Sequence, residues 1–481
     1  MPEVEGDLKE IQALRDTVTV GIDDMAVYVP KLFISTTGEF AASRGIEPAK
    51  LMKGIGVEKM SIPDAHEDAA TMAASAVLEL MKRSDIMPKD IGKIYMGTES
   101  AVDEAKAMGT YVIGMLEKVY GRGSFEECST VEFKSACIGA SYALESIAEW
   151  VGSGARSGSA SASGVAGGQG DDRIGIVVAS DVARYELESS GEYTQGAGSV
   201  AMLVKKEPRL VALDGAIGSF TRDENDFFRP LGKRVAVVNG KHSNNCYLSA
   251  VDGAFASFKR RAQKSGMLIL NNLNVSQGES ILDRFSYILF HIPYPRMTEY
   301  AALSLFRQEW KDLPRWKDVT AEIGPEPSQE MFSSPEDYGK ADAAYNKKFS
   351  KSKAFKETFK SKVGPTTSLS RQVGNIYTGS MYLGLASLAE QGLLHAGDKA
   401  CFCSYGSGCS ALVFSGTIQE GFKSLKPGNI QKKLDARKEL SLKDYEDLHE
   451  GRKSGSILPP SGEFALIGID SQGYRLYDYV S

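Results

Sequence analysis

Two stretches of the chain repeat one pattern, and this internal similarity restricts the possible folds more than any other feature. Residues 196–204, GAGSVAMLV, and 406–414, GSGCSALVF, share Gly-x-Gly-x-x-Ala followed by three apolar residues. Each lies downstream of small residues that open into a helical pattern, at 136–144 and 374–388. Two such matches in the same order predict a duplicated α/β unit, divided into residues 1–210 and 211–481, with a seam where residues from both halves meet.

Apolar, β-rich runs alternate with helical patterns along the chain. Residues 17–30 and 91–99 are typical of strands, and residues 68–83 between them are typical of a helix. The runs at 172–185 and 198–213 continue the series. The alternation predicts an α/β protein with largely buried sheets. With 481 residues, the chain is long enough to bury a large core without disulfides or structural metals.

Three segments interrupt this alternation. Residues 152–172 are rich in Gly, Ser and Ala, which predicts a flexible surface loop. Residues 311–362 are polar and charged, which is compatible with an exposed helical insertion or simply with a solvated face that has no partner. Residues 464–480 predict a hairpin of two strands joined by a Ser-Gln-Gly turn.

The overall charge restricts the possible ligands. A net charge of -6 argues against a general nucleic-acid binder but leaves room for a local basic patch. Residues 227–242 form such a patch, which contains no acidic residue; its cations are Arg229, Lys233, Arg234 and Lys241. The patch either receives the phosphates of a nucleotide-like ligand or is a solvated loop.

The six cysteines follow no paired zinc or redox spacing, so no metal site and no disulfide is expected. Cys401 and Cys403 are two residues apart, which places both on one face of a strand. Cys128, Cys246 and Cys409 are interpreted as structural. Reduced thiols, an acidic N-terminus unlike a targeting peptide, and the lack of an apolar run of ~18 residues favour a cytoplasmic protein without a membrane span.

Cys137 lies between a β-rich run and an alanine-rich helical pattern. Backbone N–H groups and the dipole at a helix N-terminus stabilise a thiolate, so this placement predicts a nucleophile with a lowered pKa. The alternative is a small buried hydrophobe, because free cysteine is among the most buried residue types.

Further candidates lie at strand ends and in turns. Glu99 and His291 each end a β-rich run, where α/β folds place ligands. Glu99 is either a general base or an acidic residue near the N-cap of the next helix. His291 is either a functional imidazole with restricted freedom or an ordinary core or surface histidine. Asn375 and Ser407 either donate to a carbonyl oxygen or serve only turn geometry. The chain has no P-loop, dinucleotide-binding fingerprint, HExxH or GxSxG motif.

Eight motifs in order resemble the 3-hydroxy-3-methylglutaryl-CoA synthase family of the thiolase superfamily. They are GTESAVDEAK, SACIGAS, ASDVARYE, YTQGAGSVAML, NNCYLSAVD, FHIPYPRM, GNIYTGSMY and FCSYGSG. The resemblance covers nearly the whole chain and implies a thiolase-like duplicated αβαβα layered sandwich. It also implies a homodimer, since members of the family are typically dimers.

The resemblance implies roles for individual residues. Cys137 matches the acetylated nucleophile, Glu99 the general acid/base, and His291 the histidine that anchors acetoacetyl-CoA. Positions that match contacts to the acyl groups or to the CoA-bearing substrate are Thr194, Ser243, Arg296, Asn375 and Ser407. Acidic positions associated with the integrity of the site are Asp103, Asp181 and Asp226. The implied substrates are acetyl-CoA and acetoacetyl-CoA, with no cofactor, metal, nucleic acid or membrane partner. A thiolase that supplies acetoacetyl-CoA, or an acyl-carrier protein, is a further candidate partner.

The chain departs from the family pattern at two positions. Ile138 stands where many members carry tyrosine, at a position that helps shape the acyl pocket, and Arg296 stands where several carry lysine. Two other functions therefore stay open: the same reaction on acyl groups held by an acyl-carrier protein, and a non-catalytic thiolase-like binding subunit. For a synthase we expect Glu99→Ala to leave acetylation of Cys137 intact while condensation nearly stops.

Overall fold

The computed structural model describes residues 19–154, 173–233, 235–266, 273, 275–426 and 428–481. Most of the predicted loop at 152–172, and Arg234 of the basic patch, therefore lie outside the described residues. A nine-stranded sheet in the order β11-β12-β13-β8-β1-β7-β6-β4-β5 forms the centre of the molecule. Its strands are β1 (Val20–Tyr28), β4 (Ile91–Gly97), β5 (Ser129–Phe133), β6 (Ile174–Ala183), β7 (Gly196–Lys206), β8 (Val211–Thr221), β11 (Tyr287–Phe290), β12 (Lys399–Gly406) and β13 (Ser410–Ile418).

The sheet contains the same four-strand arrangement twice. β4 pairs in parallel with β6, and β6–β7 and β7–β1 are antiparallel. β11 pairs in parallel with β12, and β12–β13 and β13–β8 are antiparallel. β1 and β8 join the two arrangements, and a side chain at Gly21 would overlap the carbonyl oxygen of Val211 there. The predicted duplicated architecture is confirmed, whereas the division at residue 210 stays a prediction that this symmetry supports.

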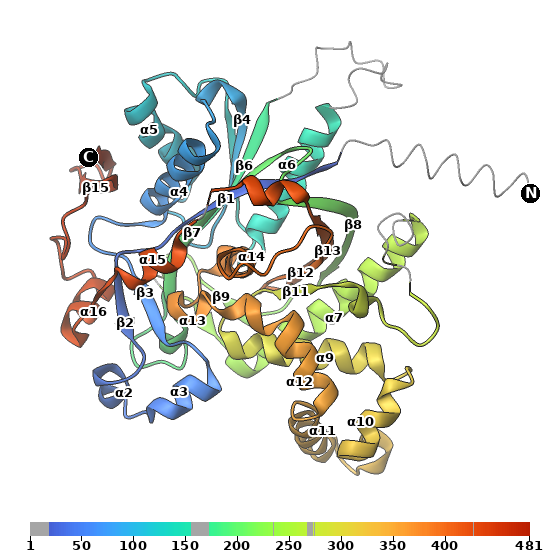
Figure 1. The fold of residues 1–481 in the computed structure, drawn as a ribbon. Coiled ribbons are helices and arrows are strands. Elements are labelled where there is room, and N and C mark those ends of the chain that lie inside the picture. Colours follow the sequence, from blue (N-terminus) through green and yellow to red (C-terminus); the bar gives the residue numbers. More distant parts are fainter. Residues whose placement is uncertain (1–18, 155–172, 234, 267–272, 274, 427) are drawn as a thin grey trace, which may run out of the picture.

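Helices form three layers around the two halves of the sheet. α6 (Gly139–Gly154) and α14 (Ser380–Glu390) share one core with both halves. α4 (Ala69–Ser84) and α5 (Met108–Tyr120) cover the outer face of the first half, and α7 (Gly240–Lys264) and α9 (Pro295–Trp310) cover that of the second. In Figure 1, α14 lies near the middle of the molecule, with α4 and α5 far from α9. This is the predicted αβαβα sandwich.

The period of two along the strands explains the layering. In β6, Val177 and Ala179 belong to the central core, while Ile176 and Val178 belong to the outer core with α4. In β12, Cys401 and Cys403 both face the α7 and α9 side, as predicted. Strands that bury both faces need continuous apolar runs, which is the pattern seen in the sequence.

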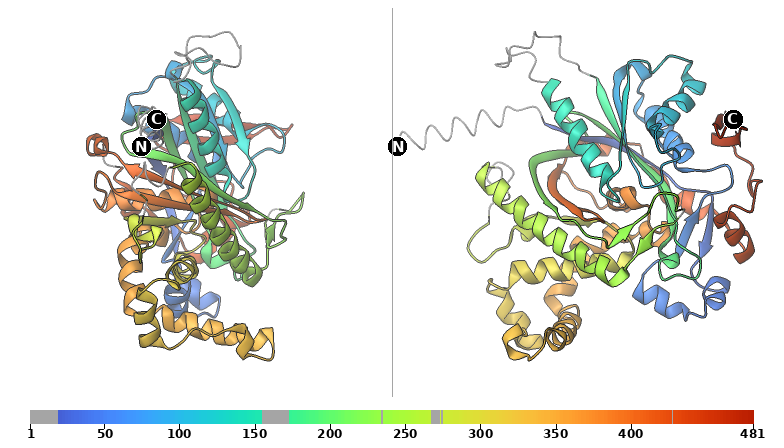
Figure 2. Two further views of the ribbon diagram at one scale, coloured as in Figure 1. Left: turned by 90° about the vertical axis from the view of Figure 1, so that its right-hand side faces the viewer. Right: turned by 180° about the vertical axis from the view of Figure 1, so that it is seen from behind.

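The charged segment at 311–362 is helical. α10 (Arg315–Ile323), α11 (Pro335–Phe349) and α12 (Lys353–Lys362) project from the second half beside α9, which Figure 2 shows from two further sides. Their inner sides bury Phe349 and Phe355 against Phe306 and Trp310 of α9, with the rings of Phe306 and Trp310 stacked at 5.1 Å. The helical interpretation is confirmed, and the inner side of the segment is part of the core.

The remaining elements lie around this sandwich. The predicted C-terminal hairpin is confirmed as β15 (Glu463–Ile469) and β16 (Arg475–Val480), and Phe464 packs into the core beneath α4. A small sheet contains β14 (Lys438–Glu439), β2 (Leu32–Ser35) and β3 (Lys59–Ile62), and a ribbon contains β9 (Phe227–Phe228) and β10 (Val237–Val238). Shorter helices are α2 (Glu39–Ser43), α3 (Pro48–Gly54), α13 (Ser370–Val373), α15 (Ile430–Asp435) and α16 (Leu442–His449). Of the helices that the structure describes, none is long and apolar enough to cross a membrane.

Candidate active site

Cys137 lies in a tight connection between β5 and α6. α6 begins at Gly139, so the thiol precedes the helix by two residues, and Ala136 has a φ of 48°. The ends of β4 and β12 approach this connection from the two halves. A side chain at Gly97 would overlap the backbone of α6, and one at Gly406 would come within 2.7 Å of the carbonyl oxygen of Ser135. Both halves of the molecule therefore fix the position of the thiol.

The Cys137 thiol contacts the Glu99 side chain. Sγ lies 2.6 Å from Oε1 of Glu99, which follows the end of β4. Burial, together with the charge of Asp181, raises the pKa of Glu99 to about 8. Burial and the charge of Glu99 raise the pKa of Cys137 well above its usual value. The lowered thiol pKa predicted from the helix terminus is therefore wrong, because desolvation and a neighbouring carboxylate outweigh the helix dipole.

Asp181, at the end of β6, holds the Glu99 strand end in place. Its carboxylate accepts a hydrogen bond from the backbone N–H of Glu99 at 2.7 Å and from the hydroxyl of Thr378 at 2.6 Å. The Thr378 hydroxyl also contacts the carbonyl oxygen of Gly97 at 2.9 Å. Asp181 is fully buried, and burial raises its pKa to about 6. The carboxylate thus connects the first half of the chain to the start of α14 in the second.

His291 follows β11 and is held from both sides. Its Nδ1 lies 2.7 Å from the Oγ of Ser380, and the hydroxyl of Tyr247 donates to its carbonyl oxygen at 2.8 Å. The Ser380 hydroxyl also lies 3.0 Å from the carbonyl oxygen of Tyr377. Burial lowers the pKa of His291 to about 3, so the ring is neutral at physiological pH. A neutral imidazole can donate one hydrogen bond without carrying charge.

Three aromatic rings pack beside the thiol. Tyr185, Phe227 and Tyr377 contact one another edge to face, with centroids 6.1 to 6.4 Å apart, and Cys137 packs against this cluster. Because Tyr377 also touches Ser380, the cluster links the surroundings of Cys137 to those of His291. Sequence reasoning did not select these aromatic residues, although Tyr377, Thr378 and Ser380 all lie in the GNIYTGS stretch that contains Asn375.

Asn375 and Thr194 meet across the seam between the halves. The backbone N–H of Asn375 donates to the carbonyl oxygen of Thr194 at 2.9 Å. The side-chain oxygen of Asn375 accepts from the backbone N–H of Tyr377 at 2.8 Å, which fixes the orientation of the amide. Both residues are almost completely buried. The side-chain oxygen of Asn375 therefore serves the turn, which was one of the two interpretations of this residue. The NH2 group takes no part in the hydrogen bond with Tyr377.

Ser243 and Ser407 are both connected to Asp226, which is fully buried, one directly and the other through Tyr405. The Ser243 hydroxyl donates to Asp226 at 3.0 Å, and the hydroxyl of Tyr405 donates to the same oxygen at 2.8 Å. Ser407 interacts with Tyr405 in the turn between β12 and β13. The charge of Asp226 contributes to the raised pKa values of Glu99 and Cys137, so this group lies near them.

Among the described residues, three further positions named from the sequence form no hydrogen bond or ion pair with the Cys137 or Glu99 side chains. Arg296, at the start of α9, pairs with Glu299 and is partly exposed. Asp103 accepts bonds from the N–H groups of the loop before α5. Ile138 is completely buried against Gly406 and, among the described residues, is not on the wall of the neighbouring cavity.

A cavity of about 980 Å³ opens onto Glu99, Ala136 and Tyr377. Among the described residues, its wall carries six basic and seven acidic side chains; the basic ones are Lys134, Arg184, Arg229, Lys233, Lys453 and Arg475. The guanidinium of Arg229 donates to the carbonyl oxygen of Glu99 at 2.8 Å. Two members of the predicted basic patch thus line this cavity, whereas Lys241 is exposed on α7. The basic residues on this mixed wall can bind the anionic groups of a ligand whose reactive end reaches Glu99.

Family models cover almost all of the described chain. Residues 17–208 match the model described as hydroxymethylglutaryl-coenzyme A synthase N terminal, and residues 211–456 match the corresponding C terminal model. The chain belongs to the hydroxymethylglutaryl-CoA synthase family. It is 34% identical over 473 residues to the hydroxymethylglutaryl-CoA synthase of Haloferax volcanii, covering 96% of this chain and 99% of that protein. It is 31% identical to the Enterococcus faecalis enzyme, covering 89% of this chain and 91% of that protein.

Solved structures of hydroxymethylglutaryl-CoA synthases share the fold. MvaS in complex with 3-hydroxy-3-methylglutaryl coenzyme A superposes with a TM-score of 0.78 at 30% identity, covering 96% of this chain and 100% of the other. The HMG synthase of the curacin biosynthetic pathway in complex with apo donor-ACP has a TM-score of 0.72 at 21% identity, over the same shares. The second likeness shows the fold alone.

Proposed function

We propose that this chain is a 3-hydroxy-3-methylglutaryl-CoA synthase that condenses acetyl-CoA with acetoacetyl-CoA through an acetyl-Cys137 intermediate in the mevalonate pathway. The observation that carries the proposal is the contact between the Cys137 thiol and the Glu99 carboxylate, 2.6 Å apart, with Glu99 on the wall of a cavity that Arg229 and Lys233 also line. A thiol paired with a base of raised pKa is suited to acyl transfer near neutral pH. The family membership of the whole chain supports the same reaction.

In the first step the Cys137 sulfur attacks the acetyl carbon of acetyl-CoA. The thiol proton moves to Glu99, which already accepts its hydrogen bond. The bond between the acetyl carbon and the CoA sulfur breaks, and the CoA thiolate takes up the proton from Glu99. Cys137 is then an acetyl thioester, and Glu99 is again an unprotonated carboxylate.

In the second step Glu99 removes a proton from the methyl group of the acetyl thioester. The resulting carbanion attacks the ketone carbon of acetoacetyl-CoA, and the alkoxide formed there takes up the proton that Glu99 removed, which restores the Glu99 carboxylate. Neutral His291, oriented by Ser380, and the NH2 group of Asn375 supply hydrogen bonds toward this oxygen. A positioned base contributes ~10²–10⁴-fold and an oxyanion donor ~3 kcal/mol.

In the third step water cleaves the bond between Cys137 and the product. Hydrolysis gives a carboxylic acid and restores the thiol, so the product leaves as 3-hydroxy-3-methylglutaryl-CoA. The edge-to-face rings of Tyr185, Phe227 and Tyr377 limit the access of water to the thioester before condensation. The reaction as proposed uses no cofactor besides the CoA thioesters.

A direct assay tests this function. Purified protein is incubated with acetyl-CoA and acetoacetyl-CoA, and 3-hydroxy-3-methylglutaryl-CoA is measured by mass spectrometry, with Cys137→Ala as the control. Product formation that depends on Cys137 supports the proposal. Turnover only on carrier-bound acyl groups would assign the protein to the acyl-carrier-protein-dependent enzymes, and failure of Cys137 to be acetylated would identify a non-catalytic subunit.

We also propose a homodimer that resides in the cytoplasm. β5 is the edge strand of the nine-stranded sheet, and Val131 in its middle is 43% exposed. An unpaired strand edge of this kind can pair with the same strand of a second copy. Sedimentation analysis of the chain and of Val131→Glu tests this, with a shift of the variant toward monomer expected. All six cysteines are free thiols, which supports a reducing compartment.

A further inference from the structure

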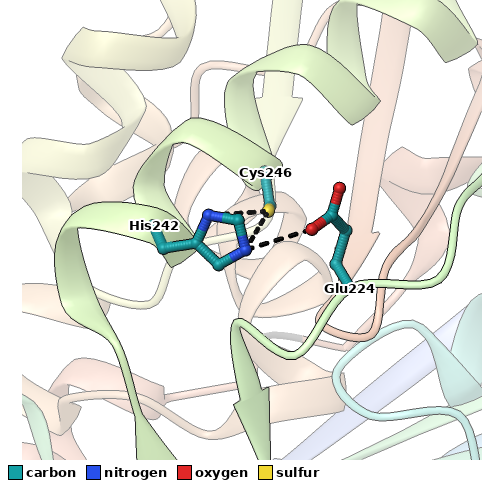
Figure 3. Close-up of side chains that lie close together, drawn as sticks. All are labelled: Glu224, His242 and Cys246. Carbon is teal, nitrogen blue, oxygen red and sulfur yellow. Dashed lines mark hydrogen bonds and ion pairs between the residues drawn. The ribbon is translucent and has the colours of Figure 1, made fainter.

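A second cluster of reactive side chains lies near Asp226, whose charge acts on Cys246. It consists of Glu224 in the loop after β8, and His242 and Cys246 on α7, which Figure 3 shows turned toward one another. The His242 Nε2 lies 3.1 Å from Oε2 of Glu224 and 3.6 Å from Sγ of Cys246. The three possible ligand atoms lie within 4.8 Å of one another.

These separations match those between ligands on one tetrahedral metal ion. Zinc binds cysteine sulfur at ~2.3 Å, histidine nitrogen at ~2.0–2.1 Å and carboxylate oxygen at ~2.0–2.2 Å. At a tetrahedral angle these bonds place nitrogen and sulfur ~3.6 Å apart, and nitrogen and oxygen ~3.3 Å apart. The observed 3.6 and 3.1 Å lie close to both values. Sγ also lies 3.9 Å from Nδ1, so the partly exposed His242 ring must turn for Nε2 to share one ion with Sγ and Oε2. Thiolate, imidazole and carboxylate together form a donor set that suits zinc.

The backbone and neighbouring groups hold the three side chains in this arrangement. His242 and Cys246 are four residues apart on α7, so they lie on one face of the helix. The His242 N–H donates to the N-cap Asn239 at 3.3 Å, and the Glu224 N–H donates to the carbonyl oxygen of Gly408 at 2.7 Å. The other oxygen of Glu224 pairs with Arg222 at 2.6 Å, which leaves Oε2 directed at His242.

We propose that Glu224, His242 and Cys246 form a binding site for a divalent metal ion of the zinc class, separate from the reaction centre. Binding releases the Cys246 thiol proton to solvent and forms the metal–sulfur bond, while the Nε2 lone pair of His242 and one carboxyl oxygen of Glu224 supply the other two bonds. Cys246 is buried, whereas His242 and Glu224 are partly exposed with side-chain exposures of 41% and 22%, so the ion enters from solvent. Water occupies the fourth position.

The metal connects two of the three segments that surround Asp226. The loop at Glu224, the first turns of α7 and the β12–β13 turn all meet there, and Asp226 accepts from Ser243 on α7 and from Gly408 in the turn. An ion that binds only the folded chain stabilises it by mass action, by about 2.7 kcal/mol at a hundredfold excess over Kd. The site therefore strengthens the support of the reaction centre without contacting substrate.

Cobalt titration of the reduced, metal-free full-length protein tests the proposal. We expect one equivalent of Co²⁺ to bind with the near-ultraviolet absorption of a cobalt–thiolate bond, and Zn²⁺ to displace it. His242→Ala, Glu224→Gln and Cys246→Ser should each weaken binding at least tenfold. The partly exposed His242 and Glu224 can be replaced without opening the core, so these two variants decide the result if Cys246→Ser fails to fold.

Two controls make the titration specific. His395→Ala removes a histidine that is 76% exposed at its side chain and distant from α7, and should bind Co²⁺ as the parent does. Cys409→Ser removes a thiol that interacts electrostatically with Cys246 and should retain the cobalt–thiolate absorption. The proposal is overturned if no cobalt–thiolate absorption forms, or if it persists undiminished in His242→Ala and Glu224→Gln.

Discussion

The Cys137 thiol donates a hydrogen bond to Glu99 across 2.6 Å, although the two residues lie 38 positions apart and follow different strands. Burial raises the pKa of both groups, and the charge of Glu99 raises that of Cys137 further, whereas the hydrogen bond from the thiol lowers the pKa of Glu99. The thiol is therefore protonated at rest and loses its proton to Glu99 only as it attacks. One carboxyl group can thus serve both acetylation and the later removal of a methyl proton.

Glu99→Ala should separate these two uses. Removal of the carboxylate eliminates one cause of the raised pKa of Cys137, so the thiolate forms more readily and acetylation persists. Condensation loses its base and should slow by ~10²–10⁴-fold. Radiolabelled acetyl-CoA measures acetylation, and product formation measures condensation. Glu420→Ala, at an exposed acid, is the matched control. Complete loss of acetylation in Glu99→Ala alone would show that the first step cannot proceed without Glu99 and would contradict its assignment as the base that only condensation requires.

Asp181→Asn should change the pH dependence of condensation. The charge of Asp181 helps raise the pKa of Glu99 to about 8, so its removal lowers that pKa. Glu99 then becomes deprotonated at lower pH, and the rising limb of the rate profile moves toward acid. Single-turnover condensation from acetyl-enzyme between pH 5 and 9 measures the shift. If the variant is slower but its pH–rate profile is not shifted, the role of Asp181 is only to bind Thr378 and the backbone N–H of Glu99.

Protonation of His291 should oppose folding in acid. Its pKa is lowered from 6.5 to about 3 by burial, so below pH 6.5 the unfolded chain binds a proton that the folded chain does not. Stability from this group is therefore fully present above pH 6.5 and falls as pH decreases toward 3. Urea unfolding at several pH values should show a shallower acid loss for His291→Asn than for the parent, and an equal loss in both would refute the neutral buried ring.

Ser380→Ala should impair condensation more than acetylation. The Ser380 hydroxyl bonds to Nδ1 of His291 at 2.7 Å, and its loss frees the ring to rotate and leaves the nitrogen without this partner. We expect a condensation rate at least tenfold lower, with acetylation of Cys137 within twofold of the parent. Ser424→Ala, at an exposed serine of a surface turn, is the control. Equal losses in both steps would indicate general damage to the site.

Phe349→Ala should destabilise the helical insertion and the half that carries His291. Phe349 is fully buried between Trp310, Trp316 and Phe355, and a Phe→Ala change in a core costs ~3–5 kcal/mol. Met331→Ala, at a side chain that is 70% exposed, should change stability by less than ~0.5 kcal/mol. Thermal unfolding of the two variants measures the difference. A small effect of Phe349→Ala would mean that the insertion packs loosely.

Local patterns in the sequence predicted the repeat and the strands, whereas the choice of Cys137, Glu99 and His291 came from the ordered motifs that resemble the family. Apolar periodicity is a property of neighbouring residues, so it reveals a strand such as 91–97 and the helix over 69–84 without knowledge of their partners. The repeat of GAGSVAMLV and GSGCSALVF likewise reports the duplication because each copy packs in an equivalent place.

Only the tertiary structure decided the electrostatics and the long-range contacts. The thiol pKa predicted from the helix terminus had the wrong direction, because burial and Glu99 act through space and leave no mark on the residues beside Cys137. The metal-ligand cluster shows the same limit: Glu224 and His242 are 18 residues apart and meet only because a loop folds back onto α7. The spacing of residues in the sequence gives information only about residues that are close along the chain. Desolvation, charge pairs and ligand geometry depend on which distant segments pack together in the fold.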